Sequence, residues 1–331
     1  MSDPHKPEIV ILDAYVANPG EYSWAPLEEL GHCTIWERSE STSDVLERTA
    51  QADIVLTDKV ELSREILEQL PNLKLISVLA TGYNVVDIKT ATERGILLCN
   101  VPNYSTASVT QHVFAVLLQL LNHTGQYAQA VADGAWCGAK DFTFFLDPIR
   151  ELEGLTLGII GYGEIGRSVA SIAKAFGMKV LVHSRTIKSD TDVRFTELTT
   201  VLAESDVISL HCPQTPDTTR MINAQTLSQM KTGAYLLNTA RGGLLDEAAV
   251  AEALNSGRLA GAALDVLSVE PPPADNPLLA AKNCLITPHV AWAGLKSRRR
   301  LLDITFANIR GFLQGKPLNL VNPDCLKNQR S

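Results

Sequence analysis

The sequence predicts an α/β protein built on two parallel β-sheets, with helices on both faces of each sheet. Three observations support this prediction. Short β-branched runs alternate with segments of helical periodicity along the 331 residues, an order that is typical of βα units. The chain is long enough for about two domains. A glycine-rich turn also stands between a predicted strand and a predicted helix in the second half of the chain.

Two series of predicted strands divide the chain. The first consists of apolar runs over residues 8–13, 53–57, 73–79 and 95–99. Between them, residues 63–70 are predicted to form a helix, with Ser63 as its N-cap and Ile66, Leu67 and Leu70 on one face. The second series covers residues 156–160, 179–183, 207–211, 234–238, 261–265 and 284–287. Its spacing of roughly 20–30 residues suits consecutive βα units.

Two long helices are predicted, over residues 106–121 and 295–313, and Gly315 and Pro317 end the second one. Residues 125–147 have weak periodicity and are expected to form a helix and then a loop. Because the second series of strands is longer and contains the glycine-rich turn, we expect a dinucleotide-binding domain over residues 104–291. It would be inserted into a substrate domain formed by residues 1–103 and 292–331.

Composition and charge exclude several classes of protein. The chain has 29 Lys and Arg residues against 37 Asp and Glu residues, a net charge of −8, which argues against a nucleic-acid binder or a binder of anionic membranes. No apolar run reaches the roughly 18 residues of a membrane span, and no signal-peptide pattern is visible. The six cysteines are far apart, which predicts reduced thiols in the cytoplasm and no metal site.

The turn at residues 161–166, with the sequence G-Y-G-E-I-G, predicts a dinucleotide site because a strand precedes it and a helix follows it. Gly161 permits the tight turn, Gly163 lets the backbone approach a pyrophosphate, and Gly166 allows close packing of helix on strand. The following helix is expected to place Val169, Ile172, Ala173 and Phe176 on one face. The residues assigned to the cofactor here are Gly161, Gly163, Glu164, Ile165 and Gly166.

The end of the next strand favours NADPH over NADH. An NAD-binding strand should end in an acid that accepts hydrogen bonds from the ribose 2′-hydroxyl, but this one ends with Ser184, Arg185 and Thr186. Ser184 can bond to a 2′-phosphate and Arg185 can pair with its charge. The alternative is that Arg185 is a solvated surface residue and the protein uses NADH as well.

Three chemically suited side chains each follow a strand of the second series: Arg241, Glu270 and His289. Ligands of open α/β sheets bind at the carboxyl ends of the strands. Histidine is a natural proton donor at neutral pH, a carboxylate can orient its ring, and arginine can clamp a substrate carboxylate. Each residue alone is more often structural, so the prediction of a proton-transfer site rests on their joint occurrence.

Four motifs occur in order along the chain: the glycine turn, N-T-A-R-G at 238–242, D-V-x-x-x-E-P at 265–271 and P-H-V-A-W at 288–292. With them the chain, from about Ile9 to Pro323, resembles the D-isomer-specific 2-hydroxyacid dehydrogenase family. The resemblance implies that Arg241 clamps the substrate, that His289 is the general acid and base with Glu270 as its partner, and that Asp265 contacts the nicotinamide amide. It further implies cofactor contacts from His211, Cys212, Pro213, Thr239 and Ala240.

The first domain resembles the glycerate dehydrogenase branch of the family at residues 78–87, V-L-A-T-G-Y-N-V-V-D. By this resemblance the amides of Thr81 and Gly82 hold a substrate carboxylate, while Lys59 and Trp292 face the substrate. Simpler alternatives are a plain turn at residues 83–84 and a solvated Lys59. Gly294 stands where that branch often has serine. Homodimers are common in the family, formed through the region that corresponds to residues 106–148, and Trp136 is either an interface residue or reaches the partner's substrate.

These observations favour an enzyme that reduces a small 2-keto acid with NAD(P)H, such as hydroxypyruvate to D-glycerate or glyoxylate to glycolate. Two alternatives remain open at this point. One is a dehydrogenase of a bulkier D-2-hydroxy acid. The other is a dinucleotide-sensing corepressor without catalytic activity, because a fold alone does not prove catalysis.

Overall fold

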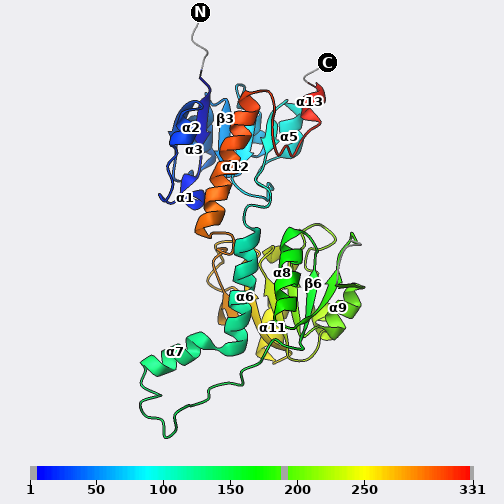
Figure 1. The fold of residues 1–331 in the computed structure, drawn as a ribbon. Helices are drawn as coiled ribbons and strands as arrows, with labels where there is room; N and C mark the ends of the chain where they lie inside the picture. The colour runs from blue at the N-terminus through cyan, green and yellow to red at the C-terminus, as the bar shows by residue number, and fades with distance from the viewer. Residues whose placement is uncertain (1–5, 188–192, 329–331) are drawn as a thin grey trace, which may run out of the picture. The chain divides into compact units, whose positions relative to one another are not determined.

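The computed structural model describes residues 6–187 and 193–328. The chain divides into two compact units. The first comprises residues 1–105 and 294–331, and the second comprises residues 106–293. Each is built on one parallel sheet with helices around it, as the sequence predicts (Figure 1).

The sheet of the first unit has the strand order β2-β1-β3-β4-β5. Its strands are β1 (Glu8–Ile11), β2 (His32–Ile35), β3 (Ile54–Thr57), β4 (Leu75–Val78) and β5 (Leu97–Cys99). Its helices are α1 (Ala14–Ala17), α2 (Ala25–Glu28), α3 (Thr42–Thr49), α4 (Arg64–Leu67), α5 (Ile88–Glu93), α12 (Leu295–Leu313) and α13 (Cys325–Asn328). The strand β2 was not predicted, because this edge strand has no fully buried side chain and therefore no continuous apolar run.

The helix predicted over residues 63–70 is shorter than expected. It is limited to the single turn α4, and Ser63 precedes it without capping it through its side chain. The hydroxyl of Ser63 instead donates to Glu65 Oε2 at 2.7 Å. By contrast, α12 has the bounds that the periodicity predicts.

The sheet of the second unit has the strand order β12-β11-β10-β9-β6-β7-β8. Its strands are β6 (Thr156–Ile160), β7 (Lys179–His183), β8 (Arg194–Phe195), β9 (Val207–Leu210), β10 (Ala234–Asn238), β11 (Leu259–Leu264) and β12 (Cys284–Ile286). Its helices are α6 (Thr106–Asn122), α7 (Thr124–Ala132), α8 (Glu164–Ala175), α9 (Leu198–Glu204), α10 (Ala224–Gln229) and α11 (Glu247–Asn255), with 3-10 turns η1 (Gly242–Leu244) and η2 (Pro277–Ala280). The two-residue edge strand β8 was not predicted.

A separate apolar layer covers each face of this second sheet. Consecutive residues of a strand point to opposite faces, so Ile208 and Leu236 belong to one layer, while Val207 and Leu237 belong to the other. Burial on both faces explains why these strands are continuous apolar runs rather than alternating ones.

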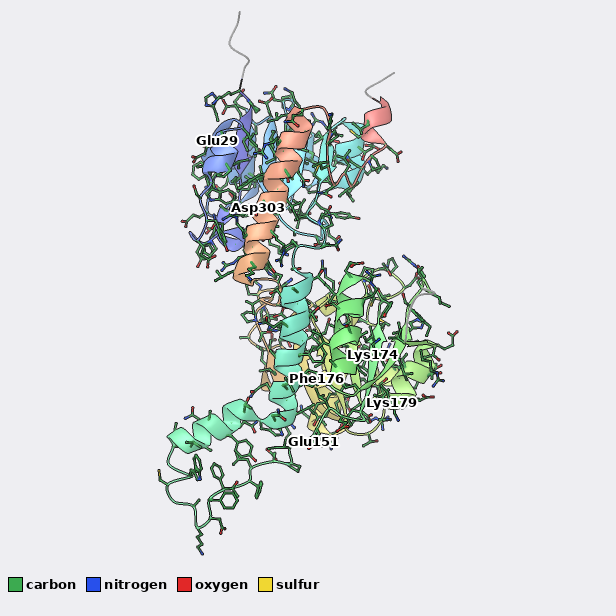
Figure 2. All side chains as sticks on the ribbon, in the orientation of Figure 1. Glu29, Glu151, Lys174, Phe176, Lys179 and Asp303 are labelled. Atoms are coloured by element: carbon green, nitrogen blue, oxygen red, sulfur yellow. The ribbon has the colours of Figure 1, made fainter. Side chains whose placement is uncertain are left out.

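The predicted apolar face of helix α8 is only partly buried. Val169 and Ala173 are buried, but Ile172 and Phe176 are 37% and 41% exposed. Phe176 instead stacks on Phe114 of α6, with ring centroids 5.5 Å apart, and Figure 2 shows it at the end of α8. Helix α8 therefore packs against two neighbours, the sheet and α6, which a single helical face does not reveal.

The segment α7 and the loop after it form an arm that projects from the body of the second unit (Figure 1). The hydroxyl of Tyr127 accepts a hydrogen bond from the amide of Leu146 at 3.0 Å, and the ring of Tyr127 packs against Phe144. Phe142 and Phe145 are 89% and 81% exposed. Within the described ranges, no helix has the length and apolar character that crossing a membrane would require.

Candidate dinucleotide and proton-transfer site

Three of the predicted functional side chains follow three neighbouring strands of the second sheet. Arg241 follows β10, Glu270 follows β11 and His289 follows β12. These strands are adjacent and parallel, so all three segments leave the sheet at its carboxyl edge. The glycine turn follows β6 at the same edge, separated from β10 by β9.

His289 and Glu270 are in direct contact. The distance from His289 Nδ1 to Glu270 Oε2 is 2.6 Å, and the second carboxylate oxygen accepts the amide of Leu267 at 2.9 Å. The two side chains are 28% and 35% exposed, so the pair is open to a ligand. Because a carboxylate only accepts, Nδ1 carries the shared proton, and Nε2 is left as the nitrogen that can exchange a proton with a substrate.

The backbone of His289 is held in an unusual conformation. Its φ angle is +53°, a region that is unfavourable for residues with a side chain. Its amide donates to the carbonyl of Asp265 at 2.8 Å. The carboxylate of Asp265 accepts the amides of Val290 and Ala291, both at 2.9 Å, and the hydroxyl of Thr287 at 2.6 Å.

Asp265 is 2% exposed, and these three donors engage both of its carboxylate oxygens. The contact with the nicotinamide amide that the family resemblance implies therefore stays a prediction. What the structure shows is a carboxylate that fastens the segment around His289.

The guanidinium of Arg241 is exposed, and its Nη1 donates to the carbonyl of Ala240 at 2.6 Å. The backbone of Arg241 is anchored, because Asn238 Nδ2 donates to its carbonyl at 2.8 Å. Gly242 packs so closely on the backbone of Leu267 that any Cβ would overlap it. The β10 loop is thus rigid at its base, while the charged end of Arg241 faces outward.

The glycine turn has the tight geometry that the sequence predicts. Gly161 has a φ angle of +98°, and a Cβ there would lie 2.6 Å from backbone atoms of His211 and Cys212. A Cβ at Gly166 would overlap the carbonyl oxygen of Gly161. Gly163 precedes the first residue of α8, and a Cβ there would enter open space. The side chain of Glu164 turns to Arg167, with an Oε1 to Nη2 distance of 2.8 Å.

These residues fit a nicotinamide dinucleotide. Open space beside Gly163, at the N-terminus of the 12-residue helix α8, suits a pyrophosphate. The hydroxyl oxygen of Thr239 is buried and, within the described part of the chain, has no hydrogen-bond partner, as expected of a group that awaits a ligand. At the end of β7, Ser184 is half-buried, whereas Arg185 and Thr186 are exposed.

The segment after β9 forms a wall behind the glycine turn. The amide of His211 donates to the carbonyl of Ile160 at 2.7 Å, and its ring Nε2 lies 2.8 Å from Ser209 Oγ. Burial lowers the pKa of His211 to about 4, so the ring is neutral at physiological pH. Burial also raises the pKa of the Cys212 thiol, and the carbonyl of Pro213 accepts the hydroxyl of Thr218 at 2.8 Å.

The predicted substrate residues of the first unit occupy two loops. Thr81 Oγ1 donates to the carbonyl of Val101 at 2.8 Å, and in the described ranges the amides of Thr81 and Gly82 have no protein acceptor. Lys59 lines a cavity of about 510 Å³ together with Asp13 and Arg38. Trp292 is half-buried and falls in the second unit.

Sequence reasoning missed three further side chains. Asp13 ends the first strand run, and its carboxylate accepts the amides of Asp58, Lys59 and Val60. An acid directly after an apolar strand was the available signal. Ser108 and His112, on α6, contact the segment that carries His289, and their local sequence contains no comparable signal.

The chain is similar to known proteins over most of its length. Residues 114–291 match the model of the NAD binding domain of D-isomer specific 2-hydroxyacid dehydrogenases. The chain is 47% identical over 320 residues to a hydroxypyruvate reductase of Blautia hydrogenotrophica, covering 95% of this chain and 99% of that protein. It is 44% identical over 288 residues to a glycerate dehydrogenase of Methylorubrum extorquens, covering 86% and 90%.

Among solved structures, an NADPH-dependent glyoxylate/hydroxypyruvate reductase from Sinorhizobium meliloti, in complex with NADP and malonate, superposes with a TM-score of 0.83. It is 28% identical and the match covers 97% of this chain and 98% of that one. The chain therefore belongs to the D-isomer specific 2-hydroxyacid dehydrogenase family, which confirms the resemblance found in the sequence. It is a dehydrogenase that binds a nicotinamide dinucleotide.

Proposed function

We propose that this enzyme reduces small 2-keto acids, hydroxypyruvate to D-glycerate and glyoxylate to glycolate. The observation that carries the proposal is the 2.6 Å contact between His289 and Glu270, on strand ends next to the one that carries Arg241. The relatives support the substrate class, because they include proteins named hydroxypyruvate reductase, glycerate dehydrogenase and glyoxylate reductase.

When bound, the reduced nicotinamide supplies the hydride that the keto carbon accepts. The new alkoxide needs a proton, and His289 donates it from Nε2. Glu270 holds Nδ1 of His289 and stabilises the ring while it is charged. Arg241 binds a substrate carboxylate with two parallel N–H donors. In the first unit, the amides of Thr81 and Gly82 are the proposed carboxylate-binding groups, as the family resemblance implies. Lys59 and Trp292 complete the proposed substrate contacts.

A panel of 2-keto acids tests this proposal, with cofactor oxidation followed by absorbance. We expect His289→Gln to abolish turnover while NADPH still binds, as measured by its fluorescence. Arg241→Lys should lower kcat/KM strongly, because a point charge cannot replace the planar fork. No reduction of any 2-keto acid by the wild-type protein would favour a dinucleotide sensor, and a higher kcat/KM for phenylpyruvate would favour a bulkier substrate.

The cofactor that we propose is NADPH, with NADH as the weaker alternative. Support comes from Ser184 and Arg185 at the end of β7, where no acid is present. Arg185→Ala should raise the KM for NADPH about tenfold, the value of one lost charged contact, and leave the KM for NADH unchanged. A marked preference of the wild-type enzyme for NADH would contradict the proposal.

We propose that two copies of the chain form a homodimer, in which the second copy covers the arm of the first. Trp136, Phe142, Phe145 and Ile149 are each more than half exposed on this one segment, and such a concentration of apolar side chains is typical of an interaction surface. Sedimentation of the wild-type protein should give twice the mass of one chain, and Phe142→Ser with Phe145→Ser should give single chains. A monomeric wild-type protein would refute the proposal.

The location that we propose is the cytoplasm. All six cysteines are free thiols. Burial raises the pKa of Cys33 to about 11 and those of Cys99 and Cys284 to about 12, so these groups are unreactive thiols that suit a reducing compartment.

A further inference from the structure

Helix α6 contacts both ends of the segment that carries His289. Ser108 and His112 are one turn apart on the helix, and therefore on the same face. Ser108 Oγ donates to the carbonyl of Ala291 at 2.7 Å. His112 Nε2 lies 3.0 Å from Thr287 Oγ1. The five residues from Thr287 to Ala291 are thus bound at their first and last positions by one rigid element.

The direction of the hydrogen bonds at Thr287 follows from its single hydroxyl proton. Thr287 Oγ1 lies 2.6 Å from Asp265 Oδ1, and the oxygens of Asp265 accept backbone amides, as a carboxylate does. Thr287 therefore donates to Asp265, and its oxygen can only accept from His112. It follows that His112 carries a proton on Nε2. The chain of donors runs from His112 to Thr287 to Asp265.

Asp265 passes this constraint to His289. Its carboxylate binds the two amides that follow His289, and its carbonyl binds the amide of His289 itself. The left-handed conformation of His289 is intrinsically unfavourable, so it persists only while its surroundings hold it. A displacement of about 1 Å in a reacting group can reduce a rate by about a hundredfold.

We propose that His112 is a positioning residue for proton transfer, which acts through Thr287 and Asp265 to hold His289 in its reactive conformation. His112 is not a catalytic residue, because its ring reaches Thr287 and Asp265, which support the proton donor, at 3.0 Å and 3.6 Å. The proposal rests on the proposed function, in which His289 protonates the reduced keto acid.

Four variants of the full-length enzyme test this role by steady-state kinetics with hydroxypyruvate and NADPH. We expect His112→Leu to lower kcat about tenfold, as a sub-ångström displacement would, with the KM values and the NADPH Kd within about twofold of wild type. His112→Gln should restore most of kcat, because its amide can donate to Thr287. Thr287→Val should lower kcat at least as much as His112→Leu. The double variant, which combines His112→Leu with Thr287→Val, should have a kcat no lower than that of Thr287→Val alone.

Thr110→Val is the matched control. Thr110 lies on α6 two residues before His112, and its buried hydroxyl oxygen has no hydrogen-bond partner within the described part of the chain. The same Thr→Val change should therefore leave kcat unchanged there. If Thr110→Val lowered kcat as much as Thr287→Val, the effect would be one of helix packing, and the proposal would be wrong.

Two results would overturn the role of His112. One is a wild-type kcat for His112→Leu, and the other is a double variant whose loss equals the product of the two single losses. If His112→Leu does not fold, nitrogen NMR of labelled histidine in the wild-type protein decides, because the proposal requires the Nε2–H form of His112 and the opposite tautomer would refute it. Failure of the proposed function would appear separately, as a wild-type protein that reduces no 2-keto acid.

Discussion

The strand order reverses once in each of the two sheets of this protein. The two sheets differ in the contact between the loops that meet at the point of reversal. In the first unit the reversal lies between β1 and β3, and in the second it lies between β6 and β9. In each unit, the loop after the first strand contacts the loop after the strand across the reversal. Such points are where open α/β sheets bind ligands.

In the first unit the contact is made by a side chain. The carboxylate of Asp13 accepts the amides of Asp58, Lys59 and Val60 at 2.8, 2.6 and 3.1 Å. The protein's own anion thus occupies these amides.

In the second unit the two loops are in contact through backbone atoms, without a side chain between them. Gly161 lies directly against His211 and Cys212, and among the described residues no side chain caps the helix N-terminus beyond it. The two units thus use the same topology differently. In the first unit a carboxylate of the protein accepts the loop amides, whereas in the second unit glycines leave the backbone amides free to bind an anionic ligand such as a dinucleotide.

The largest expected effect comes from Gly161→Ala. The new Cβ would meet backbone atoms at 2.6 Å in a conformation with positive φ, so the turn must move. We expect NADPH binding to weaken at least about 100-fold, or about 2.7 kcal/mol, together with a lower melting temperature. Fluorescence titration and calorimetry measure the two effects.

Gly163→Ala is the control for that change, since its Cβ would enter open space. It should keep the melting temperature of the wild-type protein and lose only cofactor affinity. Wild-type NADPH binding by Gly161→Ala would contradict the account of the second reversal point.

A second effect, on the stability of the fold rather than on cofactor binding, is expected from pH and depends on His211. Its pKa is lowered from 6.5 to about 4 by burial, so the unfolded chain binds more protons than the folded one between these values. The free energy of unfolding is therefore highest above pH 6.5, where the ring is neutral in both states. It decreases as the pH falls toward 4, by up to about 3 kcal/mol.

Urea unfolding of wild type and His211→Asn between pH 7 and 4.5 measures this contribution. The variant should be less stable at pH 7, and its difference from wild type should shrink as the pH falls. A difference that stays constant over this range would show that His211 does not titrate as assigned.

The smallest effect is expected at the first reversal point. Asp13→Asn removes a charged acceptor from the amides of Asp58, Lys59 and Val60, which should cost about 2 kcal/mol of unfolding free energy. NADPH binding should change by less than about twofold, because the cofactor residues lie in the other unit. Glu37→Gln, an exposed acid that lines the same cavity, should change stability by less than about 0.5 kcal/mol. If Asp13→Asn were as stable as the wild-type protein, the carboxylate of Asp13 would not stabilise the loop at the first reversal point, and the difference between the two units would not hold.

The sequence predicted most of the fold because strands buried on both faces are continuous apolar runs. It failed where burial is incomplete, at the edge strands β2 and β8, and where a helix face has two neighbours, as at Ile172 and Phe176 of α8. The length of α4 was also overestimated, since a few apolar residues at helical spacing do not determine where a helix ends.

By itself, the sequence determined the glycine turn and the identity of the residues that can move a proton. The turn is encoded within six neighbouring residues, and its geometry follows from their φ angles and lack of side chains. Only the tertiary structure decided which distant groups meet. His289 reaches Glu270 across 19 positions, and His112 reaches Thr287 across 175. Such contacts depend on the strand order and on which face of a helix packs against the sheet. The spacing of neighbouring residues in the sequence determines neither.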